Sequence, residues 1–400
     1  MVGAETSNML LYILLLAALS LGWWLGRKSY FGSDGTGKKK KRFAPDRDYF
    51  AGLNYLLNDE PDDAIDIFIE SLDINSGTLD TYMALGTLLR RRGKVDRSIT
   101  VYQDLLGESG FTKVEYSEIK LNLVQSYIAA GLLDRAEYLL TELRLEKGSV
   151  KIRALELSAN VYQREKDWLE GVSALTELLK FCPSSERSGY QNLASHFYCE
   201  LAEEEIVNEH LSRARECLRQ ASAMDKHNSR VSMLFGNLEM RMGNYKEAIK
   251  NYLRVKKQDP DFLADVFNPL VECYEKTGKK GELQKFIDNT KAEETDTSVL
   301  IALAHYLERE RGQEQARQYL LGKLAQNPSL RLLMQSIALD ASASEAQNEH
   351  KLFLKVLKEN LENKAQYQCS NCGFELKNLF WHCPSCLRWG MVKHVRGMLG

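Results

Sequence analysis

Apolar residues recur along most of the chain at the three- and four-residue spacing of amphipathic helices, and glycine, aspartate and proline separate one such segment from the next. This pattern runs from Arg47 to about Gln366, and no sustained strand-like alternation interrupts it. The pattern therefore predicts an all-α body over residues 47–366, in which each helix buries one apolar face.

The helical segments repeat one another at a spacing of 34 residues. Gly52 and Gly86 align in "YFAGLNYLLNDEPDDAIDIFIESL" and "YMALGTLLRRRGKVDRSITVYQDLL", and "MLFGNLEMRMGNYKEAIKNYLRVKKQDP" keeps the same phase. This spacing, with small and aromatic residues at fixed places, resembles the tetratricopeptide repeat. The resemblance implies antiparallel helix pairs that stack into a curved solenoid of seven to nine units, a scaffold that holds a peptide or protein.

Small and aromatic residues in the repeats are expected to be structural rather than part of a binding groove. Small residues are expected where the two helices of a unit cross, and prolines just after the second helix. The phase slips between residues 182 and 228, which predicts a longer helix pair there. The small positions are Gly86, Ala136, Ala214 and Ala248, the aromatic core positions are Phe68, Tyr102, Trp168 and Tyr252, and the terminating prolines are Pro260 and Pro328.

One run near the start of the sequence is apolar enough to cross a membrane. Met9–Gly26, "MLLYILLLAALSLGWWLG", has about the length needed to span the hydrocarbon layer. The alternative, a cleaved signal peptide, requires positive charge before the run, whereas only Glu5 precedes it and positive charges follow from Arg27. The sequence predicts a tail at 1–8, a single transmembrane helix at 9–26 and a basic linker at 27–46, with the remainder on the cytoplasmic side.

Charge is distributed unevenly along the chain. Seven Lys or Arg and two acidic residues in residues 1–45 give a local net charge of +5, whereas the whole chain has −2. An acidic body with one basic end does not favour nucleic-acid binding. Four cysteines are scattered singly and are expected to be buried core residues of a protein in a reducing compartment: Cys182, Cys199, Cys217 and Cys273.

Two Cys-x-x-Cys pairs, ten residues apart, lie close to the carboxyl end. Two such pairs supply four thiolates in a tetrahedron, so Cys369, Cys372, Cys383 and Cys386 are predicted to bind one metal ion. A pair of disulfides is the alternative, which a cytoplasmic location disfavours. The segment resembles zinc ribbons and rubredoxins, and a sulfur-only site suits either zinc or iron. Four protein ligands leave no open position, which argues against catalysis by the metal.

The residues around the cysteines predict a small domain over residues 367–400. So short a unit hardly folds without a metal. His382 adjoins Cys383 but is expected to lie outside the ligand set. Five aromatic residues are expected to cover the small core of this domain: Tyr367, Phe374, Phe380, Trp381 and Trp389.

The stretches "RDYFAGLNYLLNDEPDDAIDIF", "HFYCELA" and "CGFELKNLFWHCPSCLRWG", in that order after an apolar anchor, resemble the lipopolysaccharide assembly protein B family. The resemblance implies an inner-membrane protein that promotes degradation of the LpxC deacetylase by the membrane protease FtsH and gathers lipopolysaccharide assembly enzymes. It also implies metal ligation by the four cysteines. Oligomerisation is compatible with this reading, and no local motif assembles an enzyme active site. A general membrane-tethered scaffold or co-chaperone and a rubredoxin-like redox protein remain the alternatives.

Overall fold

The structure, a computed structural model, describes residues 77–292, 296–343, 348–362 and 364–398. The chain divides into two compact units, Met1–Leu79 and Asp80–Gly400. The predicted membrane helix at 9–26, the basic linker and Phe68 lie outside the described residues. Among the helices of the described part, none combines the length and the apolar character needed to cross a membrane.

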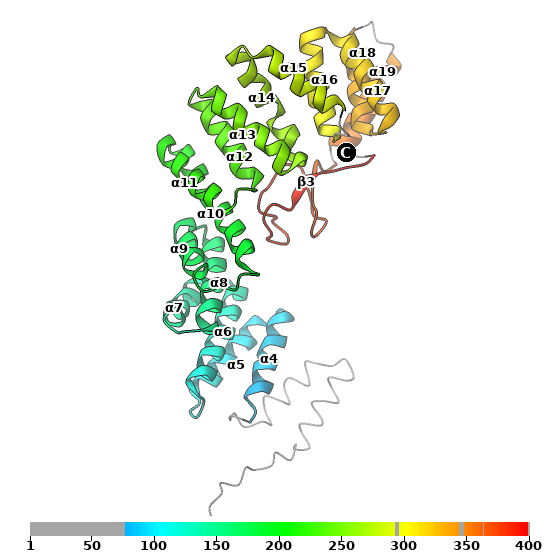
Figure 1. The fold of residues 1–400 in the computed structure, drawn as a ribbon. Coiled ribbons are helices and arrows are strands. Elements are labelled where there is room, and N and C mark those ends of the chain that lie inside the picture. The colour runs from blue at the N-terminus through cyan, green and yellow to red at the C-terminus, as the bar shows by residue number, and fades with distance from the viewer. Residues whose placement is uncertain (1–76, 293–295, 344–347, 363, 399–400) are drawn as a thin grey trace, which may run out of the picture. The chain divides into compact units, whose positions relative to one another are not determined.

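The described chain is helical up to Glu362 (Figure 1), as the repeat pattern predicted. The helices are α4 (Leu79–Arg91), α5 (Val95–Gly107), α6 (Lys113–Ala130), α7 (Leu133–Leu143), α8 (Ser149–Glu165), α9 (Trp168–Leu178), α10 (Arg187–Val207), α11 (Leu211–Met224), α12 (Ser229–Arg241), α13 (Tyr245–Gln258), the 3-10 helix η1 (Pro260–Phe262), α14 (Leu263–Thr277), α15 (Lys280–Ala292), α16 (Thr297–Arg311), α17 (Gln313–Gln326), α18 (Leu330–Ala343) and α19 (Asn348–Glu362). The longest helix, α10, lies where the repeat phase slips.

The helices pack in sequence order, and short turns connect most of them, which is the arrangement of stacked antiparallel pairs. Even-numbered helices also contact one another, as α6 does with α8, α10 with α12 and α14 with α16. We call the even-numbered helices from α6 to α18 the even-numbered layer of the solenoid. This even-numbered layer matters below because the carboxyl-terminal segment lies on it.

The small positions lie at helix crossings, as predicted. A Cβ atom on Gly86 would lie 2.5 Å from Tyr102 Cζ, and Ala136, Ala214 and Ala248 have no exposed surface. The aromatic residues Tyr102, Trp168 and Tyr252 are buried, and three of the four scattered cysteines are buried while Cys217 is half-buried. Helices α13 and α17 each end two residues before a proline. These positions therefore build the core and do not line a groove.

Gly236 of α12 provides a test of this packing. A Cβ atom there would lie 2.7 Å from Tyr252 Cζ, and Tyr252 is fully buried with its hydroxyl donating to Asn237 Oδ1 at 2.7 Å. Gly236→Ala is expected to lower the free energy of unfolding by about 1–3 kcal/mol through overpacking, measured by denaturant titration. Gly189→Ala in α10 is the matched control, because nothing lies within 4 Å of its Cβ position. An equal loss in both variants would contradict the crossing argument.

After α19 the chain forms a small antiparallel sheet with the order β2-β1-β3. Its strands are β1 (Tyr367–Cys369), β2 (Glu375–Leu376) and β3 (Val392–His394). The register pairs Cys369 with Val392 and Tyr367 with Leu376. We call residues 367–398, which contain this sheet and all four clustered cysteines, the ribbon.

Candidate metal centre and its docking surface

Each Cys-x-x-Cys pair of the ribbon lies on a tight turn. In the first turn, the Gly373 amide donates to the Cys369 carbonyl at 2.9 Å, and Gly373 adopts the left-handed conformation with φ +76°. In the second turn, the Leu387 amide donates to the Cys383 carbonyl at 2.9 Å, and Leu387 adopts φ +56°. The two turns thus share one shape, although only the first has the glycine that this conformation favours.

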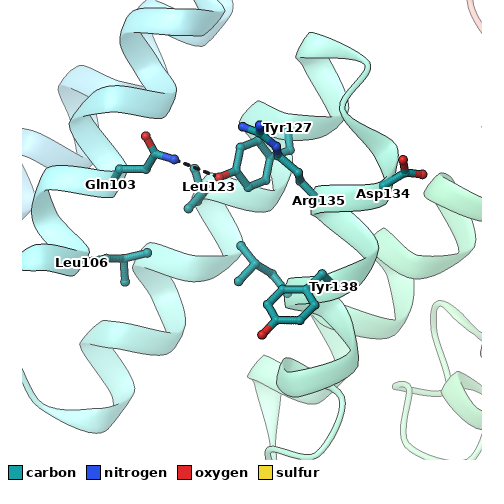
Figure 2. A pocket seen from close by; sticks show the side chains of 8 residues that line it. Gln103, Leu106, Leu123, Tyr127, Asp134, Arg135 and Tyr138 are labelled. Atoms are coloured by element: carbon teal, nitrogen blue, oxygen red, sulfur yellow. Dashed lines mark hydrogen bonds between the residues drawn. The ribbon is translucent and has the colours of Figure 1, made fainter.

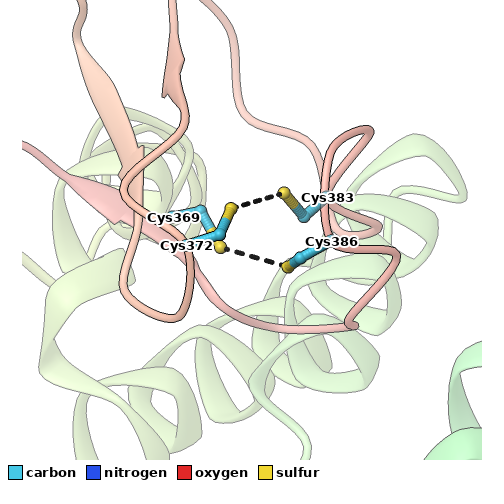
Figure 3. Close-up of side chains that lie close together, drawn as sticks. All are labelled: Cys369, Cys372, Cys383 and Cys386. Carbon is cyan, nitrogen blue, oxygen red and sulfur yellow. Dashed lines mark hydrogen bonds between the residues drawn. The ribbon is translucent and has the colours of Figure 1, made fainter. Parts of the chain in front are cut away.

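The four sulfur atoms face one another across the ribbon (Figure 3), and all lie within 4.8 Å of each other. The Sγ atoms of Cys369 and Cys386 are 3.7 Å apart, as are those of Cys372 and Cys383. These separations are too long for disulfides, whose sulfurs lie ~2.0 Å apart. Four sulfurs placed ~2.3 Å from a central ion would lie roughly 3.8 Å apart in a tetrahedron. The donor set therefore fits one tetrahedral ion such as zinc or iron.

Local donors favour the thiolate form that a metal requires. Burial acts to raise the pKa of Cys386, but the Arg388 amide and the Asn371 side chain donate to its sulfur and help bring that pKa to about 6. Burial instead raises the pKa of Cys383 to about 11 in the metal-free thiol. A bound cation would offset this cost, since a coordinating thiol is deprotonated outright. Metal binding by the four cysteines therefore releases protons, and it is stronger at neutral pH than at acidic pH.

Two of the five aromatic residues that were expected to cover the ribbon core instead face the solenoid. Trp389 belongs to the core cluster of α8, α9 and α10, and Trp381 packs on that cluster and on the cluster formed by residues of α13 to α16. Phe374 and Phe380 are exposed, so they cover no core, and only Tyr367 packs on the ribbon core as predicted. The expectation was wrong because the solenoid offers these indoles a larger apolar surface than the ribbon does.

Trp389 is the centre of the contact between ribbon and solenoid. Its ring stacks on His196 of α10 and on His382 of the ribbon, with centroid distances of 5.0 and 4.6 Å. Edge-to-face contacts join it to Trp168 and Phe197. Its indole Nε1 donates to Gln163 Oε1 at 2.9 Å, which satisfies the polar atom of a side chain only 8% exposed. His382 therefore packs on Trp389, and its Nε2 lies 3.1 Å from both Gln163 Nε2 and the Leu387 carbonyl oxygen.

Arg230 of α12 is buried beneath the two indoles. Its guanidinium lies 5.8 Å from the ring centroid of Trp381 and 5.7 Å from that of Trp389. Nη2 donates to Glu200 at 2.8 Å and Glu203 at 2.9 Å, whereas Nε and Nη1 are buried without a hydrogen-bond partner. Cation–π attraction to the two indole rings offsets part of the cost of burying these two nitrogens without hydrogen bonds. The ribbon therefore completes the environment of a charge that the solenoid alone does not satisfy.

A second set of contacts pairs a basic edge of the ribbon with an acidic segment of the solenoid. Lys393 pairs with Asp259, and Arg396 pairs with Asp261 and, at 3.5 Å, with Asp296. His394 Nε2 lies 3.0 Å from Asp265 Oδ2 and its Nδ1 lies 3.2 Å from Ser298 Oγ; the Tyr367 hydroxyl donates to Asp265 Oδ1 at 3.1 Å. The Arg331 guanidinium also donates to the Ala365 carbonyl, next to the ribbon. The contacts of the carboxyl-terminal segment with the solenoid therefore extend from α8 to α18 along the even-numbered layer (Figure 1).

Burial makes His196 sensitive to acid. Burial and the neighbouring Arg230 charge lower the pKa of His196 to about 3, and its Nδ1 has no hydrogen-bond partner in the described residues. Once exposed, the same imidazole would titrate near ~6.5. Between these values the unfolded state binds more protons, so stability falls as pH drops below about 6.5.

We expect the free energy of unfolding of the intact chain to fall between pH 7 and pH 5, and part of this fall is due to His196. His196→Gln is expected to remove that part, whose slope approaches about 1.4 kcal/mol per pH unit, the value for one proton. Denaturant titrations at several pH values measure it. His227→Gln is the matched control, because His227 is exposed. Equal slopes in all three proteins would contradict a neutral, buried His196.

Sequence reasoning predicted the four cysteines that the structure brings together but missed the solenoid side of the contact. Gln163, His196 and Arg230 are separated from the ribbon by more than 130 residues of sequence. His196 lies within the stretch "HFYCELA" that carried part of the family resemblance. The aspartates of "DPDFLAD" form a local acidic cluster that could have been noted as a partner for Lys393 and Arg396.

Comparison with known proteins agrees with this architecture. A profile of the rubredoxin metal binding domain matches residues 367–393, and a tetratricopeptide repeat profile matches residues 199–261. Lipopolysaccharide assembly protein B of Escherichia coli strain K12 is 32% identical over 394 residues, which cover 98% of this chain and 99% of that protein.

A more distant relative and a solved structure extend the comparison. The Haemophilus influenzae protein of the same name is 29% identical over 397 residues, which cover 96% of this chain and 98% of that protein. A solved tetratricopeptide repeat protein from Parabacteroides merdae covers 70% of this chain and 99% of its own, with 14% identity and a TM-score of 0.35.

Proposed function

Because the chain belongs to the lipopolysaccharide assembly protein B family, we propose that it is a non-enzymatic adaptor at the inner membrane that regulates lipopolysaccharide synthesis. In this proposal it presents the LpxC deacetylase to the membrane protease FtsH and gathers lipopolysaccharide assembly enzymes. The observation that carries the proposal is a repeat solenoid whose one candidate metal site in the described part is a closed, sulfur-only centre docked on the solenoid. Such a centre supplies rigidity rather than a reactive position.

Residues 9–26 anchor the adaptor in the inner membrane in this proposal, with residues 47–366 as the solenoid and 367–400 as the metal-binding domain on the cytoplasmic side. The apolar run followed by Arg27 and Lys28 supports this orientation. Anchoring confines the solenoid to the bilayer surface and raises its effective concentration for other membrane-bound partners. The ligands of the ion are Cys369, Cys372, Cys383 and Cys386.

Depletion of the protein tests the proposal. When its synthesis is shut off in living cells, the half-life of the deacetylase is expected to lengthen, and re-expression of the full chain is expected to restore it. The half-life of another substrate of the same protease is the control and should not change. An unchanged deacetylase half-life would contradict the link to proteolysis and leave only the coarser role of a scaffold in lipopolysaccharide assembly.

A further inference from the structure

A cavity of about 440 Å³ lies between α5, α6 and α7, near the start of the described solenoid (Figure 2). This volume is within the usual range of ligand pockets. Leu106, Leu123 and Leu139 give the cavity an apolar floor, and Tyr138 forms a wall although 76% of it is exposed. The remaining lining residues are Gln103, Tyr127, Asp134 and Arg135.

The polar rim of this cavity offers donors that the protein itself does not use. Gln103 Nε2 donates to the Tyr127 hydroxyl oxygen at 3.1 Å, which leaves the hydroxyl hydrogen free to donate outward. Arg135 is exposed and has no ion pair or hydrogen bond within the described part of the chain. Asp134 lies at the opposite rim from Gln103 (Figure 2). The side of the cavity near Tyr127 therefore favours an anionic oxygen.

A second cavity along the solenoid lacks this feature. It measures about 280 Å³, and its arginine, Arg241, is already paired with Glu209 and donates to the Ile206 carbonyl at 3.3 Å. The ribbon does not cover the first cavity either, since the polar contacts of the ribbon in the described residues go to α8 and later elements. The cavity at α5–α7 thus has both an open apolar floor and an arginine, Arg135, that makes no ion pair within the described residues.

We propose that this cavity is a docking site for a partner polypeptide that presents a large apolar side chain next to a carboxylate. The apolar side chain fills the space over Leu106, Leu123 and Leu139. The carboxylate accepts a hydrogen bond from the Tyr127 hydroxyl and pairs with Arg135, and such charge-assisted contacts give direction to an otherwise apolar site. The site does not depend on which protein the adaptor serves, so it stands or falls separately from the proteolytic role proposed above.

Site-specific photo-crosslinking in cells tests the site. Tyr138 of the full-length chain is replaced by p-benzoylphenylalanine, an aromatic residue of similar shape, and the same residue at Leu169 is the control, since Leu169 is 67% exposed on α9 and lies outside the cavity lining. We expect a crosslink to a polypeptide from position 138 only. Mass spectrometry is expected to map it to a segment with Asp or Glu adjacent to a large apolar residue.

Charge variants then test the chemistry. Arg135→Glu is expected to reduce the crosslink by about tenfold or more, the loss of one charge-assisted contact, while Arg213→Glu, the same charge change at an exposed position of α11 outside the cavity lining, leaves it intact. Replacing the mapped acidic residue of the partner by lysine is expected to restore capture by the Arg135→Glu chain. Equal crosslinking at positions 138 and 169, insensitivity to Arg135→Glu, a crosslink to lipid only, or no crosslink at position 138 would overturn the proposal.

Discussion

Replacing Cys369 and Cys372 by serine is expected to abolish metal binding, unfold the ribbon and expose the even-numbered layer of the solenoid. A segment with so small a core depends on its ion, since a structural zinc site contributes ~10–16 kcal/mol in comparable small domains. The buried Trp389 and Arg230 would then lose the partners that cover them. We expect the proposed regulation of the deacetylase to be lost, while the proposed anchor at residues 9–26 still targets the variant to the membrane.

Metal analysis, limited proteolysis of the ribbon and deacetylase half-life measure the three parts of this expectation. Cys217→Ser is the matched control, because Cys217 is half-buried in α11 and lies outside the cluster. The metal analysis of the wild-type protein also identifies the ion: an iron form is red and bleaches on reduction, and a zinc form is colourless. Regulation that persists after loss of the ion would contradict a structural role of the ribbon in function.

Trp389→Ala is expected to release the ribbon from the solenoid without removing its metal. The substitution deletes a buried indole that contacts His196, Trp168 and Phe197 and leaves the Gln163 side chain without its donor. Trp→Ala and Phe→Ala substitutions at buried positions lower the free energy of unfolding by about 3–5 kcal/mol. Hydrogen exchange of residues 367–398 is expected to rise, together with exchange in α8, α10 and α12.

Two variants control this measurement. Phe380→Ala removes an aromatic residue of the same ribbon that is 47% exposed, and it is expected to leave docking unchanged. Trp389→Phe keeps the ring contacts but loses the N–H donor to Gln163, so its effect is expected to be intermediate. Loss of metal in Trp389→Ala would contradict the separation of docking from metal binding, because this indole lies on the solenoid and not on the sulfur atoms.

Comparison of the cysteine and tryptophan variants shows which property of the ribbon is needed for the proposed regulation. The cysteine variant loses both the folded ribbon and its contact, whereas the tryptophan variant loses only the contact. If both stop regulation, docking on the even-numbered layer is the required feature. If only the cysteine variant does, the ribbon acts through a surface other than the one that faces the solenoid.

The helical body and the cysteine cluster could be predicted because their signals are local or periodic. Small residues such as Gly86 and Ala248 recur at the repeat spacing, and a helix pair requires them wherever two backbones approach closely. The spacing of Cys369 and Cys372 likewise reflects one turn of chain around one ion. Neither argument requires knowledge of any distant residue.

The sequence by itself determined the repeat architecture, the four clustered thiols and the membership of the family. Only the tertiary structure decided where the ribbon lies, that Trp381 and Trp389 face the solenoid, and that Arg230 and His196 are buried beneath them. The physical reason is that an apolar or charged side chain has no preferred partner until the chain has brought surfaces together. Burial and pairing are then decided by which of the available surfaces removes the most apolar area from water while satisfying the charges.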